Sequence, residues 1–124
     1  MAKILVVDDQ PHIVRLLRME LERDGHEVLT AADGDEAMQQ VRQERPALVV
    51  LDVNMPRKNG FEVLCELKAD PATAGIAVIM LTVRDQDEDI TRGLQVGADW
   101  YVPKPFVPGD IAALARRFVG DPTG

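Results

Sequence analysis

Residues 47–56 read ALVVLDVNMP, an unbroken apolar run that ends in the carboxylate of Asp52 and is followed by a turn at Pro56. The run is too short for a helix, and its aliphatic and β-branched residues are typical of a parallel strand buried on both faces. In open α/β sheets, ligands bind just beyond the carboxyl ends of the strands. The stretch therefore predicts a central strand with Asp52 at a functional edge of the sheet.

Length and charge limit the classes of function. The chain has 124 residues, a length suited to one domain with its own core. Its 14 basic and 21 acidic residues give a net charge of −7, so we expect no direct nucleic-acid partner. No stretch resembles a membrane span or a signal peptide, and the single Cys65 forms no internal disulfide. We expect a cytoplasmic domain over residues 1–119, without membrane contact, and a short tail over residues 120–124.

Short apolar runs alternate with amphipathic helical patterns along the chain. Pro11 suits the first turn of a helix, Asp33 with Glu36 resembles a capping box, and Asp110 is expected to cap the last helix. Five strand–helix units, with the most apolar strands third and fourth, predict an α/β fold. It is a doubly wound, flavodoxin-like (βα)5 sandwich of three layers, with a parallel sheet in the order 2-1-3-4-5. The predicted strands are 3–7, 27–31, 47–52, 76–81 and 99–102, with helices beginning near Pro11, Asp33, Phe61, Asp85 and Asp110.

This strand order brings three carboxylates to one crevice. Asp8 and Asp9 follow the first strand and Asp52 ends the third, with the switch point of the sheet between these strands. Carboxylates this close raise one another's pKa values unless a cation offsets their charge. Neither His12 nor His26 is placed to complete a nitrogen or sulfur ligand set, so oxygen ligands favour Mg²⁺, with Mn²⁺ as a second candidate.

Two further polar side chains follow neighbouring strands. Thr82 supplies a hydroxyl after the fourth strand, and Lys104 supplies an ammonium after the fifth. A metal ion, an ammonium and a hydroxyl together match what the oxygens of a phosphoryl group require. Asp52 then has two candidate roles: a metal ligand only, or also a nucleophile that accepts a phosphoryl group as an acyl phosphate.

These residues resemble the motifs of the receiver domains of two-component response regulators, the CheY-like superfamily, over essentially the whole chain. The resemblance implies that Asp52 is the phosphoacceptor and that Thr82 and Lys104 contact the phosphoryl oxygens. It also implies Mg²⁺ binding by Asp8, Asp9, Asp52 and the backbone carbonyl of Asn54, and a cis peptide before Pro105. The matching motifs are Asp8-Asp9, the run into Asp52 with Met55-Pro56 and Gly60, Thr82, Gly97-Ala98-Asp99 and Lys104-Pro105-Phe106.

The same resemblance implies a signalling role rather than that of an enzyme. A histidine kinase or a histidine phosphotransfer protein would donate the phosphoryl group, and the domain would catalyse only its own phosphorylation and dephosphorylation. Thr82 and Tyr101 would then switch the face made by the fourth helix, the fifth strand and the last helix. That face would contact a downstream protein, a fused output domain or a second phosphorylated copy. Asn54, Arg84 and Val83, which flank the site, are expected to set the lifetime of the phosphorylated state.

Three other functions fit the sequence less well. A phosphohydrolase with an aspartyl nucleophile usually carries a second aspartate two residues later, where this chain has Asn54. A flavin or nucleotide binder needs glycines or hydroxyls after the first strand, and Asp8-Asp9 would repel its phosphate. A pseudo-receiver that only binds proteins would not require the intact acidic site.

Trp100 allows two interpretations. The favoured one is packing against the fourth or the last helix, as expected for a large side chain near a core. The other is an exposed anchor for a partner, because tryptophan is enriched in interface hot spots. Cys65 is expected to pack as a small apolar residue on its helix, and His12 and His26 to lie on the surface.

Val83 leads to a testable prediction about access to the phosphoryl site. It follows Thr82 directly and is bulkier than the small residue that the family most often carries there, and its β-branched side chain should narrow the entrance. Val83→Ala should therefore be labelled faster than the wild type by acetyl phosphate in a time course. An unchanged rate would contradict this interpretation.

Overall fold

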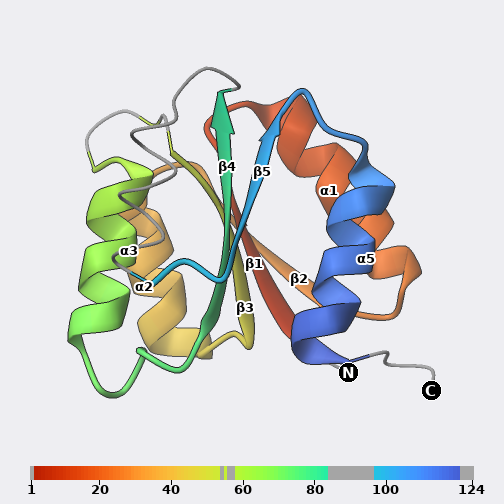
Figure 1. Cartoon of the computed structure of the whole chain (residues 1–124). Helices are drawn as coiled ribbons and strands as arrows, with labels where there is room; N and C mark the ends of the chain where they lie inside the picture. The colour runs from red at the N-terminus through yellow and green to blue at the C-terminus, as the bar shows by residue number, and fades with distance from the viewer. Residues whose placement is uncertain (1, 54, 56–57, 84–96, 121–124) are drawn as a thin grey trace.

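The computed structural model of the chain describes residues 2–53, 55, 58–83 and 97–120 (Figure 1). The predicted fourth helix, which was expected to begin near Asp85, lies outside these residues. The described elements are β1 Lys3–Val7, α1 Pro11–Arg23, β2 Glu27–Ala31, α2 Gly34–Glu44, β3 Leu48–Asp52, α3 Gly60–Ala69, β4 Ala77–Val83, β5 Trp100–Lys104 and α5 Pro108–Val119.

All described strands join one parallel sheet in the order β2-β1-β3-β4-β5, which confirms the predicted topology. Helices α1 and α5 cover one face of the sheet, and α2 and α3 cover the other (Figure 1). The molecule therefore has the predicted three layers. Among the described helices, none combines the length and the apolar character that crossing a bilayer requires.

Strand β3 is the centre of the core. All of its residues are buried, as predicted for a strand with helices on both faces. Val49 and Leu51 point into the core on the α2 and α3 side, and Leu48 and Val50 point into the core on the α1 and α5 side. The strand therefore anchors both cores and carries Asp52 at its carboxyl end.

The strand register sets which residues meet at the carboxyl edge of the sheet. Val7 pairs with Leu51, so Asp8 follows β1 at the level where Asp52 ends β3. Asp52 pairs with Leu81 of β4, which places Thr82 one residue further along the same edge. The pairing of β4 with β5 ends at Lys104. Four strands therefore deliver polar groups to one edge.

The helix starts agree with the sequence patterns except in α5. Helix α1 begins at Pro11, and the Asp33 side chain accepts a hydrogen bond from the Glu36 amide at 2.9 Å. The prediction that Asp110 caps the last helix is wrong: α5 begins at Pro108 after Val107, and Asp110 lies in its first turn. Proline is preorganised for the first helical position, and an acidic residue is favourable anywhere in the first turn.

The bounds of the last two strands also differ from the prediction. Strand β4 runs on through Thr82 to Val83, and β5 is shifted from 99–102 to Trp100–Lys104. Pro103 lies inside β5, where it pairs in register with Thr82. Proline has no N–H to donate to a neighbouring strand, but β5 is the edge strand of the described sheet, where a missing N–H is tolerated.

Two predictions about burial, one for Cys65 and one for His26, were wrong as well. Cys65 is exposed, because the apolar stripe of α3 faces the sheet from the other side of the helix. His26, expected on the surface, is 4% exposed. It follows the end of α1 and precedes β2, where the chain turns back into the sheet.

Gly60, the first residue of α3, lies in close contact with the end of β3 at the functional edge. Its N–H donates to the carbonyl of Val53 at 3.0 Å. A Cβ atom at this position would lie 2.8 Å from Cα of Val53 and closer still to the carbonyl oxygen of Asp52. The absence of a side chain therefore lets α3 begin directly against the end of β3.

Gly60→Ala should destabilise the fold because the added methyl group would push α3 away from the end of β3. We expect the free energy of unfolding, measured by urea denaturation, to fall by about 1–3 kcal/mol, as is typical of overpacking. Gly75→Ala is the matched control, since a Cβ there would meet nothing within 4 Å. Equal free energies of unfolding for the two variants would contradict the interpretation that Gly60 is required by its contact with the end of β3.

Candidate functional site

The predicted convergence of three carboxylates is confirmed. One carboxylate oxygen from each of Asp8, Asp9 and Asp52 lies within 4.8 Å of the others. Asp8 is 1% exposed and Asp52 is 2% exposed, whereas Asp9 is exposed at the mouth of the site. Charged groups are rarely buried without compensation, so the cluster requires positive charge nearby.

Lys104 supplies part of that charge. Its Nζ lies 3.1 Å from Oδ2 of Asp8 and 3.2 Å from Oδ1 of Asp52. The peptide bond from Lys104 to Pro105 is cis, as the resemblance implies. Lys104 therefore bridges the ends of β1 and β3 from the end of β5.

The environment of Lys104 keeps its ammonium charged. Burial alone would lower the pKa of Lys104, but the charge of Asp52 and the hydrogen bond and charge of Asp8 act in the opposite direction. The net result is a pKa raised above the ordinary value of 10.5. At neutral pH the lysine is therefore a cation facing two buried carboxylates.

Asp8 is held on both of its oxygens. Oδ1 accepts a hydrogen bond from the backbone N–H of Gln10 at 2.9 Å, and Oδ2 accepts one from Lys104 at 3.1 Å. The hydrogen bond from the Gln10 N–H was not predicted from the sequence. An Asp side chain that accepts from the backbone N–H two residues later is nevertheless a common turn pattern, and here it directly precedes the proline that begins α1. This turn sets the direction of the Asp8 carboxylate as the chain leaves β1.

The structure places the other predicted site residues as follows. Thr82 is fully buried on β4 at the same edge as Asp52, and Tyr101 is partly buried on β5 against the core on the α2 and α3 side. Val83 is the last residue of β4. Asn54 and Arg84 lie outside the described residues, so their predicted roles stay predictions.

Trp100 combines the two interpretations considered for it. The guanidinium carbon of Arg117 in α5 lies 5.5 Å from the centre of its ring, a cation–π contact with the last helix. The side chain is nevertheless 43% exposed, so the favoured prediction of a packed tryptophan is correct only in part. An edge strand leaves one side of such a large ring without cover.

The donor set fits a hard divalent cation. The three carboxylates offer only oxygen ligands, which are those that Mg²⁺ and Mn²⁺ prefer, and their oxygens are close enough to share one ion. The Lys104 ammonium pairs with two of the three carboxylates, and a divalent cation would add further positive charge. Asp8, Asp9 and Asp52 are therefore the described residues that could hold the metal.

Comparison with known families identifies the domain. The model of the response regulator receiver domain family matches residues 4–116. The chain belongs to this family. Receiver domains are signalling phosphoacceptor domains of two-component systems, and they bind Mg²⁺ at an acidic pocket.

The similar proteins include transcriptional regulators. The chain is 45% identical over 117 residues to the alkaline phosphatase synthesis transcriptional regulatory protein PhoP of Bacillus subtilis, covering 94% of this chain and 48% of that protein. It is 40% identical over 114 residues to the DNA-binding response regulator MtrA of Mycolicibacterium smegmatis, covering 92% of this chain and 49% of that protein. The receiver domain thus spans about half the length of these relatives.

Solved structures agree with the fold of this receiver. The chemotaxis response regulator CheY4 of Vibrio cholerae superposes with a TM-score of 0.89 at 34% identity, covering 96% of this chain and 99% of that one. The BeF3-activated DrrB receiver domain superposes with a TM-score of 0.86 at 34% identity, covering 96% of this chain and 97% of that one. Both comparisons extend over nearly the whole chain, which confirms the CheY-like fold.

The raised pKa of Lys104 predicts how its contribution to stability depends on pH. The contribution is complete below the pKa of a lysine in the unfolded chain, about 10.4, and is lost as the pH rises through the higher folded-state value. Urea unfolding in EDTA should therefore show Lys104→Met less stable than the wild type by a constant amount from about pH 7 to pH 9. The difference should shrink above about pH 10.4. A difference that stays constant into strong alkali would contradict the ion pairing.

Proposed function

We propose that this receiver domain is phosphorylated on Asp52 by a histidine kinase or a histidine phosphotransfer protein, in a Mg²⁺-dependent reaction that the domain itself catalyses. The observation that carries the proposal is the position of the Asp52 carboxylate. It ends a fully buried strand, lies 3.2 Å from the Lys104 ammonium and belongs to a cluster of three carboxylates. This arrangement combines a nucleophile, a cation and a set of metal ligands at one solvent-facing edge.

The chain's own residues divide the chemistry between them. The bond from an Asp52 oxygen to phosphorus forms while the bond from phosphorus to the imidazole nitrogen of the donor histidine breaks. Lys104 and Thr82 would donate hydrogen bonds to the phosphoryl oxygens, and Asp8 and Asp9 would hold the metal with Asp52 and the carbonyl of Asn54. When bound, Mg²⁺, or Mn²⁺ in its place, offsets the charge of the phosphoryl oxygens. Water later hydrolyses the acyl phosphate, and the domain acts on no other substrate.

An apolar hollow beside Lys104 supports a protein as the donor. It has a volume of about 340 Å³ and lies between the first half of α1 and the residues that join β5 to α5. Leu16 in its lining is 47% exposed, and the neighbouring Val107 is 63% exposed. Exposed apolar surface next to a reactive group is typical of a site for protein contact.

We propose that the phosphoryl transfer to Asp52 takes place in the cytoplasm.

The β5 and α5 face supports a signalling output. A second hollow of about 430 Å³ on this face is lined by residues that include Trp100, Tyr101, Leu114 and Arg117. We propose that phosphorylation moves Thr82 and Tyr101 and so changes this face, together with the predicted fourth helix. The face would then bind a downstream protein or a fused output domain, or a second phosphorylated copy.

The relatives support a fused output domain among these partners. The regulators named as transcriptional or DNA-binding are about twice as long as the region that this chain matches. The receiver domain itself has a net charge of −7, and we propose that it makes no direct contact with nucleic acid. Asn54, Arg84 and Val83 remain our candidates for setting the lifetime of the phosphorylated state, and we propose that Val83 also limits access to the site.

The test is phosphorylation with acetyl phosphate, followed by separation of the phosphorylated form on a phosphate-affinity gel. The wild type should be labelled in Mg²⁺ and not in EDTA, and Asp52→Asn should not be labelled, because the amide is a poor nucleophile. Asp35→Asn, at an exposed acid in the first turn of α2, is the matched control and should be labelled like the wild type. Labelling of Asp52→Asn, or labelling in EDTA, would overturn the proposal.

A further inference from the structure

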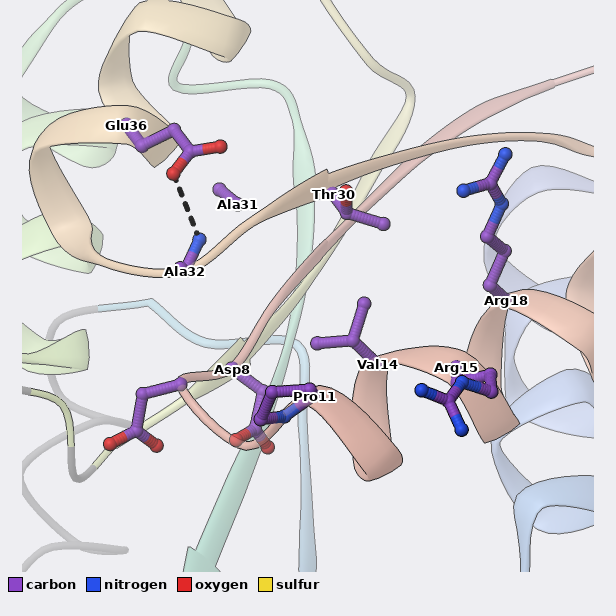
Figure 2. Close-up of a pocket in the computed structure, with 10 residues that line it drawn as sticks. Asp8, Pro11, Val14, Arg15, Arg18, Thr30, Ala31, Ala32 and Glu36 are labelled. Carbon is purple, nitrogen blue, oxygen red and sulfur yellow. Dashed lines mark hydrogen bonds between the residues drawn. The ribbon is translucent and has the colours of Figure 1, made fainter.

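A hollow of about 330 Å³ lies on the far side of the acidic cluster from β5, between the start of α1, the end of β2 and the start of α2 (Figure 2). Its floor is apolar and includes Pro11, Val14 and Ala31. The volume is at the lower end of the range found for sites that bind small molecules. The hollow therefore has the size and the floor of a site for a short, partly apolar ligand.

One wall of the hollow is cationic. Arg15 and Arg18, three residues apart on α1, both line it, and their side chains are exposed. Figure 2 shows both guanidinium groups on the α1 side of the hollow, with Val14 between them and the opposite wall. Arg18 uses Nε to pair with Glu22 at 3.2 Å, a contact that holds its side chain along the helix. Guanidinium groups in this position are suited to a carboxylate.

The opposite wall is anionic. Glu36 stands across the hollow from the two arginines (Figure 2), and its Oε2 accepts a hydrogen bond from the Ala32 N–H at 3.2 Å, which orients the carboxylate. Asp9 also lines the hollow and is exposed. Asp8 contributes less, because its two oxygens already accept hydrogen bonds from Gln10 and Lys104. Glu36 and Asp9 are therefore the groups that face an incoming cation.

We propose that this hollow binds a small zwitterion. Its carboxylate would pair with Arg15 and Arg18, its ammonium would pair with Glu36 and Asp9, and its aliphatic chain would cover Val14 on the floor. The lining carries the two guanidinium groups of α1 and the carboxylates of Asp8, Asp9 and Glu36, so the carboxylates repel a simple anion and the guanidinium groups repel a simple cation. Only a ligand with both charges is attracted at both ends. The proposal does not rest on the proposed function, although Asp8 and Asp9 belong both to the lining of the hollow and to the acidic cluster.

The test is a titration of the ¹⁵N-labelled full chain in EDTA, followed by ¹H–¹⁵N correlation spectra. The probes are 6-aminohexanoate and its two single-charge counterparts, hexanoate and hexylammonium. The zwitterion should cause saturable shifts of the amides of Val14, Ala31 and Ala32, with a Kd on the order of millimolar, because the charges are exposed to water. Each single-charge probe should bind several-fold more weakly.

Charge-removing variants test both walls separately. Arg15→Gln and Glu36→Gln should each weaken binding of the zwitterion by about two- to fivefold, the range expected for exposed charge pairs. Their matched controls are Arg23→Gln on α1 and Asp35→Asn on α2, exposed residues outside the hollow that should leave binding unchanged. Glu36→Gln keeps an oxygen for the Ala32 N–H, and the spectra report directly whether each variant is folded. Equal binding of hexanoate, or the absence of saturable shifts, would overturn the proposal.

Discussion

The contact of one ammonium with two buried carboxylates is the interaction on which this receiver domain depends. Asp8 and Asp52 end adjacent strands in the interior, and Lys104 lies 3.1 and 3.2 Å from them. Carboxylates buried without a cation would be costly and would repel each other. The register of β1 against β3 and of β4 against β5 is therefore as important to the site as the three residues themselves. The sheet keeps the charges together, and the charges define its functional edge.

Lys104 pairs with two of the three carboxylates of the cluster. Asp9 adds the third carboxylate at the mouth, where it is exposed to solvent. Carboxylate oxygens within 4.8 Å of one another repel, and a divalent cation or a phosphoryl–metal pair would relieve this cost to stability. Functional sites are where proteins retain costs of this kind. Asp8 and Asp9 also border the hollow beside α1, so the two sites share a wall.

The sequence predicted the strand order and the acidic cluster, because both follow from local patterns. An apolar run that ends in an acid indicates a buried strand with a polar carboxyl end, and the carboxyl ends of parallel strands share one edge. The errors lie where a local pattern has more than one solution. Asp110 and Pro108 both suit a helix start, and Pro108 is the first residue of α5, with Asp110 in its first turn. The strand predicted to span 99–102 continues through Pro103 to Lys104, because an edge strand tolerates a proline.

The sequence by itself determined that β3 is buried, that Asp52 stands at its end, and that Asp8, Asp9, Thr82 and Lys104 reach the same edge. Burial and periodicity are properties of neighbouring residues, so a single chain segment is enough to show them. Only the tertiary structure decided that Lys104, 96 residues away along the chain, donates to Asp8 as well as facing Asp52. It alone also placed Gly60 against the end of β3 and separated Arg15 from Glu36 across the hollow. These contacts depend on strand register and helix placement in three dimensions, which no local pattern specifies to within a hydrogen-bond length.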